Sequence, residues 1–410
     1  MRSAGYLLWV LPICVYPAVA QTLTTLYSFQ GTPDGGFPFS DVLLTKGGTL
    51  YSTTSGGGSN GAGSVFELVP PSQPGGEWTD KLLVSLPGGS GGGMPFAGVV
   101  EDDSGAFYSA NAGTPPNELG NIFQVAPVDG GQSWTYNIIW HFSGSDGATP
   151  QADLLYRGGV FYGATTAGGA HNRGTIFMLA PPATAGGSWT HTLLYSFSNG
   201  ADGGYPFSSL LMDQSGALYG TTSQGGGSKD GGTVFKLAPP VPPATGWTLT
   251  TLFTFERGAS GGSPYDGVVM DKDGNLYGSA YLGGTSGDGV IFELSPPASS
   301  GDAWTETVLL YFNGENGSGP NGGVTLGPGG EVYGTAVRGG SADQGVVFVL
   351  IPTGGTWHQV LLHQFSGGGD GGWPMGKLRI DPHGGLLGTT YYGGAYKDGT
   401  VFSLTTHLSE

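Results

Sequence analysis

The amino-acid sequence predicts an all-β fold, a seven-bladed β-propeller of four-stranded blades closed by the N-terminal strand completing the last blade. Glycine accounts for 82 of the 410 residues, and one short pattern recurs seven times at intervals of 54 to 58 residues. The two ends of the chain also carry complementary parts of one repeat. Helices are disfavoured because nearly every window of a dozen residues holds Gly-Gly or Pro, which cost about 1 and about 3 kcal/mol per helical position.

The first twenty residues are predicted to be a signal peptide. Arg2 gives a positive start, YLLWVLPICVY is apolar, and AVA is a small-x-small cleavage site before Gln21. We therefore expect residues 21–410 to form a single propeller domain that is secreted, either extracellular or periplasmic. A lipoprotein is the weaker alternative, because Pro and Ile precede Cys14 where a lipobox needs small residues.

Charge and cysteine content exclude several classes of protein. Cys14 is the only cysteine and would leave with the signal peptide, so neither disulfides nor cysteine-bound zinc can hold the mature chain together. The formal charge of −17 argues against nucleic acid or an anionic membrane surface as a partner. No later apolar run is long enough for a membrane span. We expect a monomer.

Four strands are expected in each repeat. The first follows a proline, as in PFSSLLMD from Pro206. The second carries LYGTT at Tyr219, after a glycine turn. The third carries VFKL, whose Phe235 lies 16 residues after Tyr219, whereas the spacing is 15 in the other six copies. The fourth runs from a tryptophan to an apolar residue eight positions on, as from Trp189 to Phe197. These near-constant spacings predict one hairpin register for every repeat.

The seven copies of the second strand are centred on Tyr51, Tyr108, Tyr162, Tyr219, Tyr277, Tyr333 and Leu387. Units of this size cannot bury their own faces, so they are expected to cover one another around an axis. The segment QTLTTLYSF from Gln21 has the register of a fourth strand, and the last repeat ends after its third strand. The N-terminal strand should therefore complete the last blade and remove an open edge. A β-solenoid is the alternative, for which these units are long.

The repeated G.LYGTT..GG....GTVF.L resembles the GloVer (Gloeo_Verruco-type) tandem-repeat family of secreted bacterial proteins, and the turn-then-LYG spacing is similar to NHL-type propeller repeats. The resemblance covers residues 21–410. It implies a secreted propeller, and no catalytic motif defines the family. Such proteins often carry a C-terminal anchor; this chain departs from that pattern by ending in THLSE.

Functional residues are expected on one face, which we call the top face. It is formed by the loops from each fourth strand to the next proline and by the loops between second and third strands. Four of these loops carry an aspartate four residues before the proline: Asp34, Asp146, Asp202 and Asp370. Because one residue type repeats in equivalent loops, we interpret these aspartates as Asx-type turn residues. The glycine pairs are likewise interpreted as turns, since no phosphate-binding motif is present.

Sites of function should break the repeat, and the third residue after the proline does so at the expected mouth of the central channel. The residues there are Asp41, Gly98, Asp153, Ser209, Gly267, Gly323 and Lys377, with Asp266 one position earlier in its repeat. Asp41, Asp153 and Asp266 are candidate catalytic carboxylates for cleaving a glycan, or oxygen ligands for a calcium ion in the central channel. The alternative is an Asp41–Lys377 ion pair in a hydrated channel. No other cofactor or metal is expected.

Aromatic residues form a second departure from the repeat. Trp373, Tyr391, Tyr392 and Tyr396 gather in the seventh repeat, and Tyr281 lies in the corresponding loop of the fifth. Flat rings with polar tips suit the faces of sugars, although they can equally pack against neighbouring loops. His171 and Arg173 lie in the non-repeated loop AHNRG. With Lys377, these residues are the candidate ligand-binding set.

These features favour a protein that binds a polysaccharide or cell-surface glycan on its top face. The first alternative is a glycan-cleaving enzyme, a glycoside hydrolase or polysaccharide lyase that uses the carboxylates at the channel mouth. The second is a protein-interaction scaffold. The sequence leaves open whether the protein is an enzyme.

Overall fold

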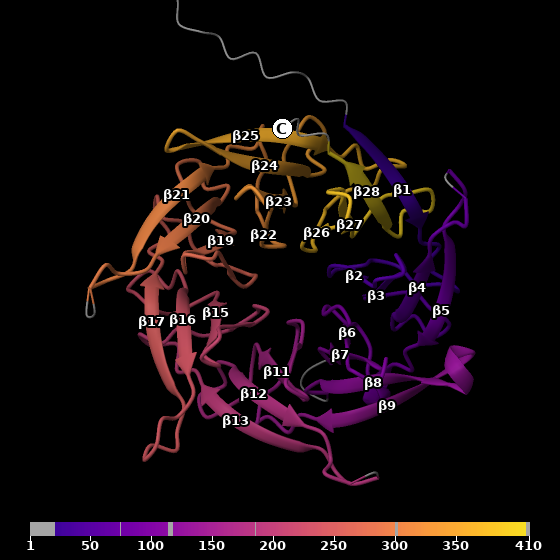
Figure 1. Ribbon diagram of the computed structural model, residues 1–410, viewed down its shortest axis with the longest axis horizontal. Helices are drawn as coiled ribbons and strands as arrows, with labels where there is room; N and C mark the ends of the chain where they lie inside the picture. Colours follow the sequence, from indigo (N-terminus) through magenta and orange to yellow (C-terminus); the bar gives the residue numbers. More distant parts are fainter. Residues whose placement is uncertain (1–20, 74, 114–117, 185, 300–301, 407–410) are drawn as a thin grey trace, which may run out of the picture.

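The computed structural model describes residues 21–73, 75–113, 118–184, 186–299 and 302–406. Seven four-stranded antiparallel sheets surround a central axis as blades (Figure 1). In this described part of the chain the only helices are two short 3₁₀ segments, Gly89–Gly91 and Asp129–Gly131, and neither could cross a membrane. The predicted all-β, seven-bladed propeller is therefore confirmed. The predicted signal peptide lies outside the described residues.

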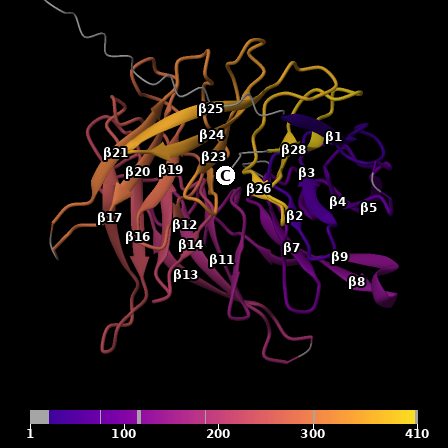
Figure 2. The same cartoon turned by 45° about the horizontal axis from the view of Figure 1, so that its top comes forward.

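Each blade runs from a very short innermost strand to a long outermost strand, and loops project from the sheets at both ends of the ring (Figure 2). The innermost strands are β2 (Leu43–Leu44), β6 (Val100–Glu101), β10 (Leu155–Arg157), β14 (Leu211–Met212), β18 (Val269–Met270), β22 (Val324–Leu326) and β26 (Arg379–Ile380). The second strands are β3 (Leu50–Thr54), β7 (Phe107–Asn111), β11 (Val160–Thr165), β15 (Leu218–Thr222), β19 (Leu276–Ala280), β23 (Val332–Ala336) and β27 (Leu386–Thr390).

The third and outermost strands complete the blades. The third strands are β4 (Ser64–Val69), β8 (Asn121–Val128), β12 (Thr175–Ala180), β16 (Thr233–Ala238), β20 (Val290–Ser295), β24 (Val346–Thr353) and β28 (Thr400–Thr405). The outermost strands, in the same order, are β5 (Thr79–Ser85), β9 (Ser133–His141), β13 (Thr190–Ser196), β17 (Thr248–Thr254), β21 (Thr305–Tyr311), β25 (Thr356–Gln364) and β1 (Thr22–Ser28). Blades 1 to 7 are numbered in this order below.

Burial differs between the second strands, which are covered on both faces, and the outermost strands, whose burial alternates. All five residues of β15 are buried, because neighbouring blades cover both of its faces. The outermost strand β17 instead alternates exposed and half-buried residues over its first four positions. The hydrophobic core therefore lies between blades rather than within any one of them. Seven phenylalanines of the third strands are fully buried there: Phe66, Phe123, Phe177, Phe235, Phe292, Phe348 and Phe402.

The glycine of the repeated LYG pattern makes room for one of these rings. Gly220 of β15 pairs across the hairpin with Phe235 of β16. A Cβ atom at Gly220 would lie 2.8 Å from Cζ of Phe235, closer than packed carbon atoms approach. A small residue therefore belongs opposite the phenylalanine, and blades 1 and 2 place serine there, at Ser52 and Ser109.

Every outermost strand carries a β-bulge, which the sequence spacing does not reveal. In blade 3, Phe177 pairs with Leu193 while Ile176 pairs with Tyr195, so Leu194 lies outside the ladder. Leu194 is buried as a result. The bulge re-aims a leucine or isoleucine at the same position of all seven strands, namely Leu26, Leu83, Ile139, Leu194, Leu252, Leu309 and Leu362.

The N-terminal strand closes the ring. β1 pairs antiparallel with β28 from Thr22↔Thr405 to Ser28↔Thr400, as the outermost strand of blade 7. The Thr389 hydroxyl donates to the carbonyl of Ser40 at 2.8 Å, which joins blade 7 to blade 1 near the axis. The predicted closure is therefore present.

Main-chain hydrogen bonds also join neighbouring blades through the residue before each proline. The Tyr205 N–H donates to the Arg173 carbonyl of the preceding blade at 2.8 Å, and the Tyr205 carbonyl accepts from Ser223 N–H of its own blade at 3.2 Å. All seven pre-proline residues have left-handed backbone angles, with φ between 53° and 63°: Phe37, Met94, Thr149, Tyr205, Ser263, Gly319 and Trp373. Such angles are unfavourable for non-glycine residues. The surrounding hydrogen bonds hold the main chain in this conformation immediately before each proline.

Candidate functional site

The top-face loops lie together as expected. In blade 4, Gly204 of the loop before the innermost strand bridges Gln224 of the loop between the second and third strands. Equivalent bridges occur in blades 1, 3, 5, 6 and 7. The two sets of loops therefore form one surface.

The four loop aspartates are turn residues, as predicted. Asp202 accepts a hydrogen bond from the Ser198 N–H at 2.8 Å, and Asp370 accepts one from the Ser366 N–H at 2.9 Å. The equivalent bonds run from Gln30 to Asp34 and from Ser143 to Asp146. Their carboxylates also bind a side chain of the outermost strand, as when Trp140 donates to Asp146 at 3.1 Å. These carboxylates hold the loops and do not face the axis.

The axis itself carries a pocket with two layers. The upper layer comes from the first residue after each proline, one from every blade: Phe39, Phe96, Gln151, Phe207, Tyr265, Asn321 and Met375. Each of these side chains is half-buried. Six of the seven, together with Tyr281 and Val337, line a cavity of about 310 Å³. We refer to these seven residues as the upper layer.

Two aromatic pairs belong to this layer, and three of their four residues, all but Phe96, line the upper cavity. Phe39 and Phe96 of blades 1 and 2 meet edge to face, with ring centroids 5.0 Å apart. Phe207 and Tyr265 of blades 4 and 5 meet in the same way at 5.3 Å. Between these pairs the upper layer contains two amide side chains, Gln151 in blade 3 and Asn321 in blade 6. The upper cavity thus combines apolar walls with two amide groups.

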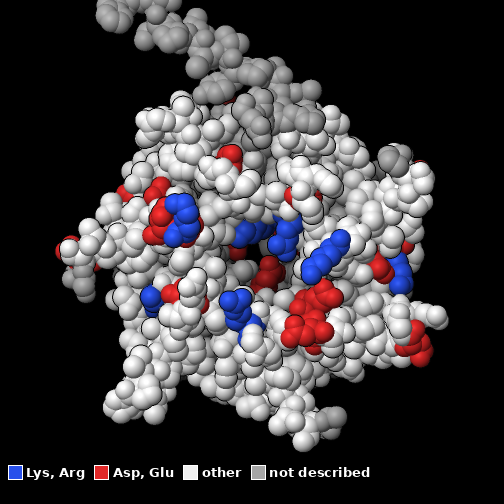
Figure 3. Space-filling model, viewed as in Figure 1, with Lys and Arg blue, Asp and Glu red and all other residues white. Residues whose placement is uncertain are grey.

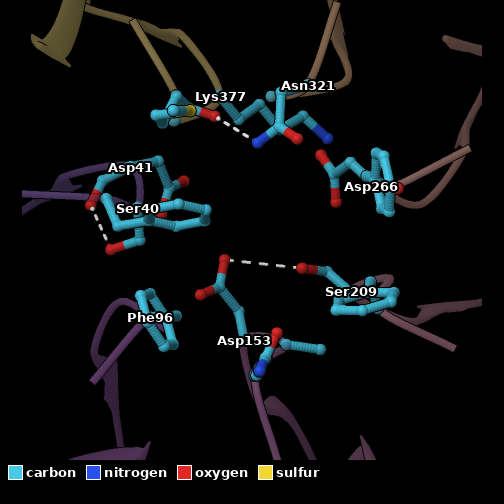
Figure 4. Close-up of a pocket in the computed structure, with 16 residues that line it drawn as sticks. Ser40, Asp41, Phe96, Asp153, Ser209, Asp266, Asn321 and Lys377 are labelled. Atoms are coloured by element: carbon cyan, nitrogen blue, oxygen red, sulfur yellow. Dashed lines mark hydrogen bonds between the residues drawn. The ribbon is translucent and has the colours of Figure 1, made fainter. Parts of the chain in front are cut away.

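The lower layer contains the predicted carboxylates. Asp41, Asp153, Asp266 and Lys377 line the same pocket, with Ser40 and Ser209. In Figure 4 the carboxylates of Asp153 and Asp266 point toward a common central space. The pocket that these residues line together with the upper layer has about 60 Å³ of free space, room for little more than water or one small group. We call this layer the acidic floor.

Asp153 is held from two neighbouring blades. The Gly98 N–H of blade 2 donates to Asp153 Oδ1 at 2.6 Å, and the Ser209 hydroxyl of blade 4 lies 3.5 Å from Oδ2. Gly98 also adjoins Asp41, since a Cβ atom at Gly98 would lie 3.1 Å from Asp41 Oδ1. The two carboxylates therefore approach one peptide from different blades.

Electrostatics in the acidic floor favour neutral or cation-paired carboxylates. Burial and the charge of Asp41 raise the pKa of Asp153 to about 7. Burial also raises the pKa of Asp41, against the lowering influence of Arg379 and Lys377. The floor therefore changes its charge near neutral pH. Figure 3 shows acidic and basic side chains gathered around the central opening of the ring.

The alternative Asp41–Lys377 ion pair is not formed. No contact within 4.0 Å joins Lys377 to a carboxylate in the described part of the chain. Lys377 acts on Asp41 through space, from the neighbouring blade 7. Likewise, no group of three or more His, Cys, Asp or Glu side chains among the described residues is arranged to hold a metal ion. Calcium in the channel stays a prediction.

The predicted aromatic cluster of blade 7 lies beside the upper cavity and is largely packed together. Trp373 stacks on Tyr391 with an interplanar angle of 8° and centroids 6.5 Å apart, and Tyr392 lies 5.7 Å away. The Arg338 guanidinium lies over the Trp373 ring at 4.2 Å. Tyr391 also contacts Phe39 of the upper layer, with ring centroids 6.2 Å apart. Trp373 thus has ring contacts of its own and less free surface than the sequence suggests.

The remaining candidates lie at different distances from the axis. Tyr281 contacts Tyr265 at 5.2 Å and lines the upper cavity. Tyr396 is 56% exposed and lines neither layer. Arg173 contacts the Tyr205 ring and hydroxyl of the next blade, which gives it a structural role. His171 is exposed on its loop.

The sequence analysis did not predict the upper layer. It singled out the third residue after each proline but not the first, although residues two apart in an extended segment point the same way. Phe39, Phe96, Phe207 and Tyr265 therefore accompany the acidic positions at the axis. The signal was available in the post-proline pattern and needed only this periodicity.

The fold and the pocket together define a class of protein, a closed seven-bladed β-propeller with a small-molecule-sized pocket on its axis. Within that class, the chain belongs to the Gloeobacter/Verrucomicrobia repeat family, whose model matches residues 13–177, 128–303 and 241–410. The resemblance read from the repeats is confirmed. No curated protein matches the chain.

Several solved structures are similar to the chain at low sequence identity. The extracellular domain of a one-component system from B. thetaiotaomicron is 14% identical with a TM-score of 0.54; the match covers 95% of this chain and 43% of that chain. An oxidoreductase (glucose dehydrogenase) from Thermus thermophilus is 16% identical, with 76% and 96% covered and a TM-score of 0.44. Trypanosoma rangeli sialidase is 11% identical, with 83% and 58% covered and a TM-score of 0.41. Likeness at this identity concerns the fold and not the function.

Proposed function

We propose that this protein is a secreted, monomeric β-propeller that binds an extracellular glycan in its axial pocket, from the top face. The observation that carries the proposal is the layering of the pocket, in which an aromatic cavity of about 310 Å³ lies over a polar, acidic floor. That volume is at the lower end of the range for small-molecule sites, which is about 300–1,000 Å³. One or two sugar units would fit, with the rest of a longer chain outside.

The chemistry of both layers suits a sugar. The pairs Phe39–Phe96 and Phe207–Tyr265 offer apolar surface to the C–H faces of a sugar ring. The amides of Gln151 and Asn321 and the hydroxyl of Ser209 can donate and accept hydrogen bonds with sugar hydroxyls. Because the blades surround the cavity, a polysaccharide would enter by its end.

Retention on a panel of immobilised polysaccharides, followed by calorimetry with oligosaccharides of the retained type, tests this proposal. Two variants use residues that the repeat already places in the same position: Phe207→Gln, as in Gln151, and Tyr265→Asn, as in Asn321. Each should weaken binding about two- to tenfold, because a lost stacking contact is worth roughly 0.5–1.5 kcal/mol.

Val241→Ala is the matched control, since Val241 is 76% exposed and lies outside the pocket. Unchanged affinity in both pocket variants would overturn the proposed surface. Trp373→Ala and Tyr392→Ala report separately on whether the packed cluster beside the cavity also contacts the glycan.

Glycan cleavage is a second candidate, favoured by the raised pKa of Asp153. A carboxylic acid with a pKa near 7 can donate a proton to a leaving group, while a neighbouring carboxylate serves as base or nucleophile. Asp41 and Asp266 line the same floor. Product release from a bound polysaccharide, lost in Asp153→Asn and in one of Asp41→Asn or Asp266→Asn, would support it. Release that survives all three single substitutions would exclude it.

A further inference from the structure

The acidic floor narrows the class of glycan, and this inference rests on the proposed function. We propose that the ligand presents a primary ammonium group to the floor, so that the recognised unit is an amino sugar with a free amine at the end of its chain. The ammonium group would lie below the upper layer and between Asp153 and Asp266.

The floor lacks a cation in contact with its carboxylates. Asp41 lines the pocket, yet no side chain or main-chain group of another described residue donates a hydrogen bond to its carboxylate. Asp153 receives only the Gly98 N–H and the distant Ser209 hydroxyl. Carboxylates that face a common space without a cation are unfavourable, and a ligand cation would relieve that cost.

The charge balance at Asp153 points the same way. Repulsion from Asp41 and repulsion from Asp266 each exceed the attraction of Lys377 on this carboxyl group. Lys377 and Arg379 act chiefly on Asp41, at the blade 7 side of the floor. The side formed by Asp153 and Asp266 is therefore where an added positive charge gains most.

The walls above the floor favour the same ligand group. Phe39 and Phe96 on one side and Phe207 and Tyr265 on the other present rings around the entrance to the floor. Aromatic rings attract cations, primary ammonium groups included, through their quadrupole. A uronic acid would meet the opposite environment, because its carboxylate would approach the floor aspartates.

The binding should depend on pH in a defined direction. Asp153 faces Asp41, Asp266 and Lys377, and its proton is lost around neutral pH. An ammonium ligand favours the ionised carboxylate. Its affinity should therefore rise from pH about 5 to pH about 6.5, and it should fall at higher pH as the sugar amine, which is less basic than an alkyl amine, loses its proton.

Calorimetry in amine-free buffer tests the inference with three β-1,4-linked tetramers, of glucosamine, of N-acetylglucosamine and of glucose. The glucosamine tetramer should bind at least about tenfold more tightly than the other two, and its affinity alone should rise across this pH interval. Asp153→Asn and Asp266→Asn should each remove most of the preference for the glucosamine tetramer, whereas the control Val241→Ala should keep it. Phe207→Gln should weaken the binding of the glucosamine tetramer.

The outcomes separate this inference from the proposed function. Equal affinity for the three tetramers overturns the amino-sugar inference and leaves glycan binding standing. The same holds if none of the three binds while a polysaccharide of the panel does. Failure of every glycan to bind overturns both. A preference for glucosamine that persists in Asp153→Asn and Asp266→Asn would place the amine elsewhere and would also overturn the inference.

Discussion

The Gly98 N–H donates to Asp153 Oδ1 at 2.6 Å, so the main chain of blade 2 directly positions the carboxyl group of blade 3 that has the pKa of about 7. That bond favours the ionised carboxylate, whereas burial and the charge of Asp41 disfavour it more strongly. The balance leaves Asp153 as a carboxyl group that exchanges its proton near neutral pH.

Asp153→Asn should change how thermal stability depends on pH. Because the folded-state pKa lies above the ordinary value, the folded protein binds the proton more strongly than the unfolded chain between pH about 4 and about 7. The contribution of this group to stability is full below that interval and is lost as the pH rises through it. Melting temperatures measured from pH 5 to pH 8 should therefore favour the asparagine variant increasingly.

Asp213→Asn is a control in which the pH dependence of stability should change in the opposite direction. Asp213 accepts hydrogen bonds from Ser215, Ala217 and Tyr219, and these bonds hold its pKa below the ordinary value. Its contribution is present above the ordinary pKa and is lost as the pH falls below it. A parallel response of the two variants to pH would contradict both assignments.

Asp80→Leu should stabilise the protein. Burial and the charge of Asp34 raise the pKa of Asp80 to about 7, and Asp80 Oδ1 is buried without a hydrogen-bond partner. Blades 4 and 7 place Leu249 and Leu23 at this position. The leucine variant should gain about 1 kcal/mol in unfolding free energy at pH 8, measured by denaturant titration, and less at pH 4. A loss of stability at pH 8 would show that the carboxyl group has a favourable partner.

Gly225→Ala should destabilise more than Gly384→Ala. Both glycines have left-handed backbone angles, with φ of 76° and 84°, so both substitutions incur about 1–2 kcal/mol of backbone strain. A Cβ atom at Gly225 would also lie 2.7 Å from Cα of Gly203, whereas nothing lies within 4 Å at Gly384. The overpacking should add about 1–3 kcal/mol. Denaturant titration of the two variants measures the difference, and equal losses would disprove the close loop packing.

Removal of the segment that forms β1 should open the ring. β28 would then present an unpaired edge, and the apolar residues that β1 covers, Phe402 and Leu404 among them, would lose their neighbour. The truncated protein should elute as dimers or larger species in size-exclusion chromatography and melt at a lower temperature. Adding the peptide of residues 21–30 in excess should partly restore the monomer, and a truncated chain that stays monomeric with unchanged melting would contradict closure by β1.

The sequence alone is enough to predict the blades, because the spacing from the Tyr position to the Phe position is nearly constant and the N-terminal segment has the register of a fourth strand. It also predicts that Asp41, Asp153 and Lys377 lie together near the axis, and all three line the axial pocket. The bulge at Leu194 could not be predicted, since a bulge changes pairing without changing strand length.

The surroundings of Trp373 were equally out of reach, because its contact with Arg338 joins two loops whose relative position depends on the completed ring. The upper layer could have been predicted, because residues two apart in an extended segment lie on the same side. Long-range packing of loops is thus the main part of the site that local patterns leave undetermined.

The hydrogen bonds at the residue before each proline have a consequence for how this protein could change. Main-chain hydrogen bonds hold Tyr205 to Arg173 and Ser223, and the side chains of the same two residues add further contacts. The side chain that follows the proline is therefore presented by a frame that does not depend on its identity. Seven such positions surround one axis, namely 39, 96, 151, 207, 265, 321 and 375. A selection experiment could vary the residues at these positions in combination to direct the same propeller to a different ligand.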